Sequence, residues 1–105
     1  MVEPETIRKA VDLLREAARP RKIILFGSYA TGSPDDGSDV DFLVVEPGRP
    51  DIMAETVRLL RVLGPLRIPA DVIVVGATDF DEWSDIPGNV VFEAASAGKV
   101  LYEAA

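Results

Sequence analysis

The sequence contains no cysteine and no histidine. Without cysteine the chain has neither disulfides nor thiolate metal sites. Without histidine it has no imidazole base, and most zinc sites are excluded as well. Carboxylates are therefore the candidate metal ligands, and such hard oxygen ligands suit Mg²⁺ or Mn²⁺.

Basic residues are scarce, with 11 Lys and Arg against 18 Asp and Glu, for a net charge of −7. Because affinity for the phosphate backbone comes largely from Lys and Arg, unaided binding to DNA or RNA is not expected. No apolar stretch is long enough to cross a bilayer, and Met1–Pro4 has no signal-peptide pattern, so we expect a cytoplasmic protein without membrane contact. The length of 105 residues predicts one domain, residues 1–105.

Hydrophobic periodicity and turn residues predict an alternation of helices and strands. The predicted helices begin at Pro4, at Pro50 or Asp51, and at Ser84 or Asp85, and they end before Pro20, at Leu63 and before Gly98. The predicted strands are Lys22–Phe26, Asp39–Glu46, Ala70–Val75 and Val100–Tyr102. This pattern predicts an α/β (α+β) fold, a mixed sheet of about four strands with helices packed on it.

The buried faces of the helices follow from the same periodicity. The first helix is expected to bury Ile7, Val11, Leu14 and Ala18. The second is expected to bury Ile52, Leu59, Leu60 and Leu63, and the last Val90, Val91, Ala94 and Ala95.

The segment Gly27–Asp41 departs from this pattern, because it places acidic residues where a buried strand begins. Asp39 and Asp41 are two residues apart, so both carboxylates lie on the same face of the strand. Like charges on one face repel, and a bound cation relieves the repulsion. A local folding rule broken in this way points to function.

A third acid, Asp71, stands near the start of the strand that begins at Ala70. If it shares one end of the sheet with Asp39 and Asp41, the two strands run parallel and the helix between them is their crossover. Gly27 follows the first strand, so it reaches the same end only if that strand is antiparallel to the second.

Three carboxylates without a histidine or thiol suit a two-metal phosphoryl-transfer site. In this interpretation Asp39 and Asp41 bridge the metals, and Asp71 completes one metal's shell or acts as the base. Gly27 allows close backbone approach to a phosphate, and Ser28 adds amide and hydroxyl donors. Plainer interpretations stay open at this point: an ordinary turn at Gly27 and Ser28, and solvated aspartates at the start of a strand.

Gly27-Ser28, then ten residues, then Asp39-Val40-Asp41 resembles the signature of the nucleotidyltransferase superfamily that includes DNA polymerase beta. The short chain, Ser38 before the first aspartate and the closing segment Gly98–Glu103 resemble the minimal nucleotidyltransferases. These small prokaryotic proteins are often the antitoxin partners of HEPN-domain toxins. The resemblance covers nearly the whole chain.

This resemblance implies Mg²⁺-dependent transfer of AMP from ATP, with two ions in the site, to a tyrosine hydroxyl of the toxin. It implies catalytic and metal-binding roles for Asp39, Asp41 and Asp71, and a phosphate-binding role for Gly27 and Ser28.

One position departs from the family pattern: Thr31 stands where many members carry Arg. The loop that follows contains Asp35 and Asp36 and no basic residue. The triphosphate therefore lacks one charge-assisted contact, unless Arg67 or a cation of the partner replaces it.

Two classes of function follow. The first is an enzyme that adenylylates its toxin; the second is a binding antitoxin with a weak or inactive site that neutralises the toxin by covering it, which Thr31 favours. A small-molecule nucleotidyltransferase would need more structure for its acceptor, and a template-directed polymerase would need a basic cleft. Because no acceptor-binding domain is present, the acceptor must come from another protein or subunit, in a hetero-oligomer or homo-oligomer.

Three aromatic positions and one acidic segment have open roles. Asp79–Asp85 is predicted to be a connector that caps the last helix, or alternatively a docking surface for a basic partner. Trp83 within it is expected to pack on the core, or else to anchor an interface. Tyr29 either stacks near the nucleotide or caps the sheet edge, and Tyr102 is expected to pack in the final strand.

Overall fold

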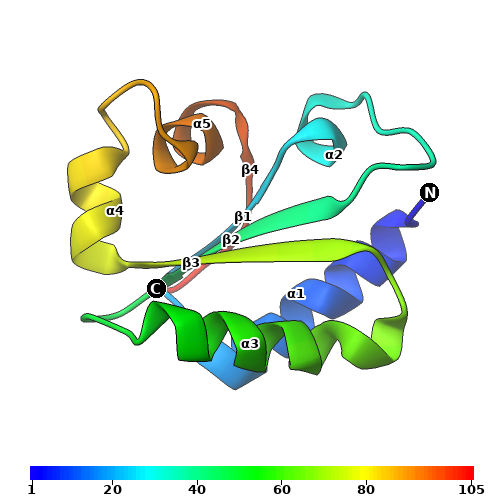
Figure 1. Cartoon of the computed structure of the whole chain (residues 1–105), viewed down its shortest axis with the longest axis horizontal. Coiled ribbons are helices and arrows are strands. Elements are labelled where there is room, and N and C mark those ends of the chain that lie inside the picture. The colour runs from blue at the N-terminus through cyan, green and yellow to red at the C-terminus, as the bar shows by residue number, and fades with distance from the viewer.

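The computed structural model describes residues 1–105 and contains one four-stranded sheet with helices on both faces (Figure 1). The helices are α1 (Pro4–Ala18), α2 (Ser28–Thr31), α3 (Ile52–Leu63), the 3₁₀ helix η1 (Gly64–Leu66), α4 (Ala77–Trp83) and α5 (Val90–Ala97). The strands are β1 (Lys22–Phe26), β2 (Val40–Glu46), β3 (Ala70–Gly76) and β4 (Lys99–Glu103).

The strands lie in the order β3-β2-β1-β4. β1 is antiparallel to both of its neighbours, β2 and β4. β2 and β3 are parallel, and α3 is the crossover between them. The predicted fold class, the mixed sheet and the relative directions of the first three strands are therefore confirmed.

Alternation along β2 divides the core into two layers. Val40, Phe42 and Val44 belong to the cluster that includes residues of α1 and α3. Leu43 and Val45 belong to the cluster on the other face, with residues of α4 and α5. Figure 1 shows α1 and α3 below the sheet and α4 and α5 above it. β2 is thus buried on both faces, which explains its nearly continuous apolar sequence.

The helix α3 begins as predicted, because the side chain of Asp51 accepts a hydrogen bond from the Ala54 amide at 3.1 Å. Leu59 and Leu63 are buried as expected. The expectation for Ile52 and Leu60 is wrong, since they are 45% and 37% exposed. α3 packs on β3 and α1 along the row that contains Leu59 and Leu63, and the other two side chains lie off that row.

The connector predicted at residues 79–85 is wrong, because residues 77–83 form α4. Phe80 is buried against the sheet and holds this short helix in place. The last helix also begins later than predicted. Its N-cap is Asn89, whose side chain accepts from the Phe92 amide at 2.9 Å.

The aromatic side chains outside the core have different surroundings. Trp83 is 47% exposed, so the expectation that it packs on the core is wrong. Tyr102 packs on the α1 side of the sheet as predicted, with the Arg15 guanidinium 5.4 Å from its ring centroid. The Tyr29 hydroxyl accepts a hydrogen bond from the Val2 amide at 2.9 Å, which ties the N-terminal segment to α2.

An acidic pair lies at the end of the sheet where β2 stops. Glu46 is only 6% exposed, and its Oε2 atom has no hydrogen-bond partner. Burial and the neighbouring Glu55 raise its pKa to about 7. The guanidinium of Arg58 donates two hydrogen bonds to Glu55, at 2.8 and 2.7 Å, and one to the Ala17 carbonyl oxygen at 2.9 Å. This network links β2, α3 and the end of α1.

No helix of the chain combines the length and the apolar character that crossing a membrane requires.

Candidate active site

The turn after β1 depends on Gly27. Its backbone has φ 75° and ψ −157°, a region that is essentially restricted to glycine. A Cβ built at this position would clash with the Asp41 carboxylate. Glycine is therefore required both for the backbone conformation and for close approach to Asp41.

The helix α2 begins directly at this turn. The amides of Ala30 and Thr31 donate to the Gly27 carbonyl oxygen at 3.0 and 3.2 Å. The Thr31 hydroxyl lies 3.3 Å from the Ser28 carbonyl oxygen and 3.1 Å from the Ser33 hydroxyl. Thr31 thus completes its own turn, and it brings no positive charge to the site.

The three predicted acids lie at one rim of the sheet. Asp41 and Asp71 are opposite each other on the parallel strands β2 and β3, and Asp39 comes just before β2. Asp41 alternates with Leu43 and Val45, so its side chain lies on the face covered by α4 and α5. The expected parallel and antiparallel pairings do bring Gly27, Asp41 and Asp71 to the same end of the sheet.

The electrostatics of this rim are unfavourable. Burial raises the pKa of the Asp41 carboxyl, and the charges of Asp71 and then Asp39 raise it further. Asp39 and Asp71 themselves are exposed, and none of the three acids forms an ion pair. A bound cation would relieve the repulsion.

The donor set therefore suits a divalent cation in charge and in ligand type. No group of three or more acidic side chains in the chain is arranged closely enough to hold a metal ion as the side chains stand. The metal-binding roles of Asp39, Asp41 and Asp71 stay predictions.

The loop before β2 is held by its own side chains. Asp35 accepts hydrogen bonds from the Gly37 amide at 2.9 Å and from the Ser38 hydroxyl at 3.2 Å. The Ser38 hydroxyl in turn accepts from the Asp35 amide at 3.0 Å. Asp35 therefore stabilises the turn.

Two cavities adjoin each other at this end of the molecule. One of about 340 Å³ includes Ser38, Arg67 and Pro69, and the Val40 amide donates to the Pro69 carbonyl oxygen at 2.9 Å. This cavity therefore lies next to the starts of β2 and β3.

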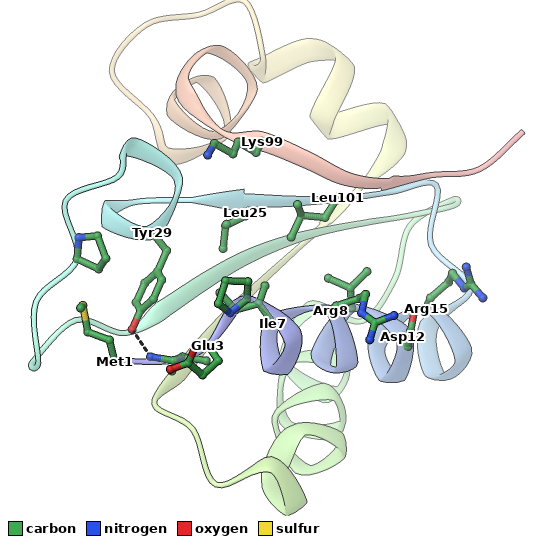
Figure 2. A pocket seen from close by; sticks show the side chains of 14 residues that line it. Met1, Glu3, Ile7, Arg8, Asp12, Arg15, Leu25, Tyr29, Lys99 and Leu101 are labelled. Carbon is green, nitrogen blue, oxygen red and sulfur yellow. Dashed lines mark hydrogen bonds between the residues drawn. The ribbon is translucent and has the colours of Figure 1, made fainter.

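The other cavity, of about 630 Å³, is a groove between α1 and the strands β1 and β4, and none of the five predicted site residues lines it (Figure 2). Sequence reasoning missed both cavities, because their walls come from distant parts of the chain and share no motif.

Replacing Gly27 with Ala is expected to lower the free energy of unfolding by about 1 to 3 kcal/mol, because the side chain enters a strained conformation and displaces the Asp41 carboxylate. Urea denaturation measures the change. Gly37→Ala is the control, since a Cβ there meets Asp35 at an ordinary 3.5 Å. Equal stability of Gly27→Ala and the wild type would show that the tight contact has no energetic consequence.

The comparisons with known proteins agree with this geometry. Residues 7–96 match the family model of the nucleotidyltransferase domain. A segment of 47 residues is 47% identical to a Methanocaldococcus jannaschii protein named "Putative protein adenylyltransferase MJ0604". That segment is 43% of this chain and 47% of the relative, so the match spans about half of the relative's length.

Two solved structures share the fold. A toxin–antitoxin structure with AMP-PNP has a TM-score of 0.67 at 22% identity, over 98% of this chain and 75% of that chain. A mutant of the toxin–antitoxin MntA-HpeT has a TM-score of 0.62 at 24% identity, over 91% and 72% of the two chains. Because the family model covers most of the sequence, and the fold agrees with it, the chain belongs to the nucleotidyltransferase domain family.

Proposed function

We propose that this chain transfers AMP from ATP to a tyrosine hydroxyl of a partner HEPN-domain toxin and thereby acts as its antitoxin. The observation that carries the proposal is the position of Asp41, which lies opposite Asp71, two residues after Asp39, and against the Gly27 backbone. The proposed unit is one domain, residues 1–105, acting in the cytoplasm.

Each residue has a role in this proposal. Asp39, Asp41 and Asp71 would hold Mg²⁺, which would neutralise phosphate charge and lower the pKa of the attacking hydroxyl as pyrophosphate leaves. The Gly27 turn and the start of α2 bind the β- and γ-phosphates through the backbone amides and the Ser28 hydroxyl. Asp71 lies on the side of Asp41 away from this turn, so it faces the acceptor.

A protein acceptor suits the surface around the acids. Asp39 and Asp71 are exposed, so a side chain of another protein can approach them. The relatives support this choice in part, since one is named an adenylyltransferase of proteins and the two solved structures are toxin–antitoxin structures.

A second candidate is a binding antitoxin that neutralises the toxin without transferring AMP. Thr31 favours it, because its hydroxyl completes the α2 turn and supplies no cation for the triphosphate. The segment Gly27–Glu46 contains no Lys or Arg at all.

The test is label transfer from ATP to a co-expressed HEPN toxin in the presence of Mg²⁺. Label in the α-phosphate is expected on the toxin and label in the γ-phosphate is not, because AMP rather than phosphate is transferred. EDTA is expected to abolish labelling, and so is the double variant Asp39→Asn, Asp41→Asn.

Undiminished labelling by the double variant would disprove the proposed site. If the wild type transfers no label, and calorimetry shows no ATP binding while the double variant still protects cells from the toxin, the second candidate is correct.

A further inference from the structure

The groove between α1 and β4 has a volume of about 630 Å³, nearly twice that of the cavity beside it, and the proposed reaction leaves it without a role. Its floor is apolar: Figure 2 shows Leu25 and Leu101 on the strands facing Ile7 on α1. It follows α1 from Pro4 to Arg15, a distance of about 16 Å for a helix. A run of exposed apolar surface of this kind is typical of a binding site.

The groove lies beside an unpaired strand edge. β4 is the outermost strand of the sheet, so the backbone groups on its outer side have no strand to pair with. An edge of this kind binds extended polypeptide through main-chain hydrogen bonds, while pockets beside it receive side chains. The groove therefore suits a polypeptide segment better than a small molecule.

The charge of the groove differs from that of the rest of the protein. Three basic residues line it (Arg8, Arg15 and Lys99) against the two acids Glu3 and Asp12, whereas the chain as a whole has a net charge of −7. Lys99 forms no ion pair with any residue of the chain. The groove thus favours a segment that carries acidic side chains next to apolar ones.

The groove also extends toward the end of the sheet where β2 and β3 begin. It shares Met1, Val2, Glu3 and Tyr29 with the smaller cavity, which continues to Ser38 and Pro69 at the starts of β2 and β3. A segment lying in the groove would reach this end of the sheet on the face covered by α1 and α3, whereas the Asp41 side chain lies on the opposite face.

We infer that the α1–β4 groove binds an apolar, acidic polypeptide segment of the partner protein. The identity of the partner rests on the proposed function. The binding itself is tested without nucleotide or metal.

Two adjacent residues of β4 provide a matched pair of variants. Leu101 is 37% exposed and lines the groove. Val100 is 51% exposed and pairs with Ile24, whose side chain lies in the cluster on the opposite face. Leu101→Asp therefore places a charge inside the groove, and Val100→Asp places the same charge on the same strand but outside it.

The experiment begins with selection of random 12-residue peptides, displayed on their messenger RNA, against the immobilised protein. Enriched peptides are expected to contain Asp or Glu among apolar residues, and the best one is expected to shift the amide resonances of α1 and β4. Leu101→Asp is expected to weaken its affinity at least about tenfold, because a charge in an apolar contact has no partner. Val100→Asp is expected to change it less than about twofold, since its contacts lie elsewhere.

Several outcomes overturn the inference: no enrichment, enrichment of basic peptides, resonance shifts elsewhere, or equal effects of the two variants. A further one is a dimer in sedimentation analysis that Leu101→Asp dissociates, which would show that a second copy covers the groove. Because the readout uses no ATP, failure here leaves the proposed transfer reaction standing. Likewise, a failure of label transfer would not affect the conclusion from peptide binding.

Discussion

Asp41→Asn is expected to reduce AMP transfer at least about 100-fold while stabilising the metal-free protein. The loss follows because Asp41 is the central acid of the rim, opposite Asp71 and against Gly27. The gain follows because its pKa is raised in the folded state, by burial first and then by Asp71 and Asp39. Asn resembles the protonated carboxyl that the folded protein favours.

The sign of the stability change follows from linkage. A carboxyl whose pKa is raised on folding binds its proton more tightly in the folded state, so its contribution to stability falls as pH rises above the unfolded value. At pH 7 the Asp41 carboxyl therefore lowers the stability of the wild type, and this loss is absent from Asp41→Asn. Thermal denaturation in EDTA at pH 7 measures the difference, and label transfer measures the loss of activity.

Asp36→Asn is the control for both measurements. Asp36 lies in the loop before β2, is exposed and makes no side-chain hydrogen bond, so neither the stability nor the activity is expected to change. An Asp41→Asn protein that is less stable than the wild type would show that Asp41 has a structural partner. One that is more stable but fully active would remove Asp41 from the reaction.

Glu46→Gln is expected to raise the free energy of unfolding by about 1 to 3 kcal/mol at pH 8 and to leave it nearly unchanged at pH 4.5. Burial and Glu55 raise the pKa of Glu46 from 4.5 to about 7. The wild type therefore loses stability as pH rises from 4.5 to 7. The glutamine side chain of the variant stays neutral throughout this range, so it places no buried charge beside Glu55.

Glu55 behaves in the opposite way. Arg58 and Glu46 lower its pKa from 4.5 to about 2, so it contributes stability above pH 4.5, and this contribution is lost as the pH falls toward 2. Glu55→Gln is therefore expected to destabilise the protein at pH 8, because it removes the charged partner of Arg58. At pH 8 the two variants are thus expected to change the free energy of unfolding in opposite directions.

Urea denaturation of the three proteins at pH 4.5 and pH 8 provides the measurement. A wild type whose stability is the same at pH 5 and pH 7, or a Glu46→Gln protein that is less stable at pH 8, would contradict a protonated Glu46 in the folded protein. In either case, the buried Oε2 atom has a partner that the structure does not show.

Much of the fold was predictable from local pattern. β1 has the predicted bounds, and β2, β3 and α3 differ from theirs by one or two residues. These elements have strong signals: long apolar runs flanked by Gly, Pro and Asp, and the Asp51 cap. The α4 helix was missed because a single buried side chain, Phe80, holds it among acidic residues that look like a loop.

The site was partly predictable for the same reason. The spacing of Asp39, Asp41 and Asp71 relative to strand starts implies a shared rim if the strands have the right directions, and they do. The contact between Gly27 and the Asp41 carboxylate was not predictable, because it depends on how closely β1 and β2 approach at that rim. Neither was the exposure of Trp83, which depends on how α4 turns about Phe80.

By itself, the sequence determined the acidic, histidine-free chemistry of this protein, its mixed sheet and the acids that share a strand face. These properties follow from residue type and from spacing along the chain. Only the tertiary structure decided which groups are desolvated, as at Glu46, and which surfaces meet to form a groove, as α1 and β4 do. Burial and cavity shape depend on the packing of segments far apart in sequence, and no local pattern specifies that packing.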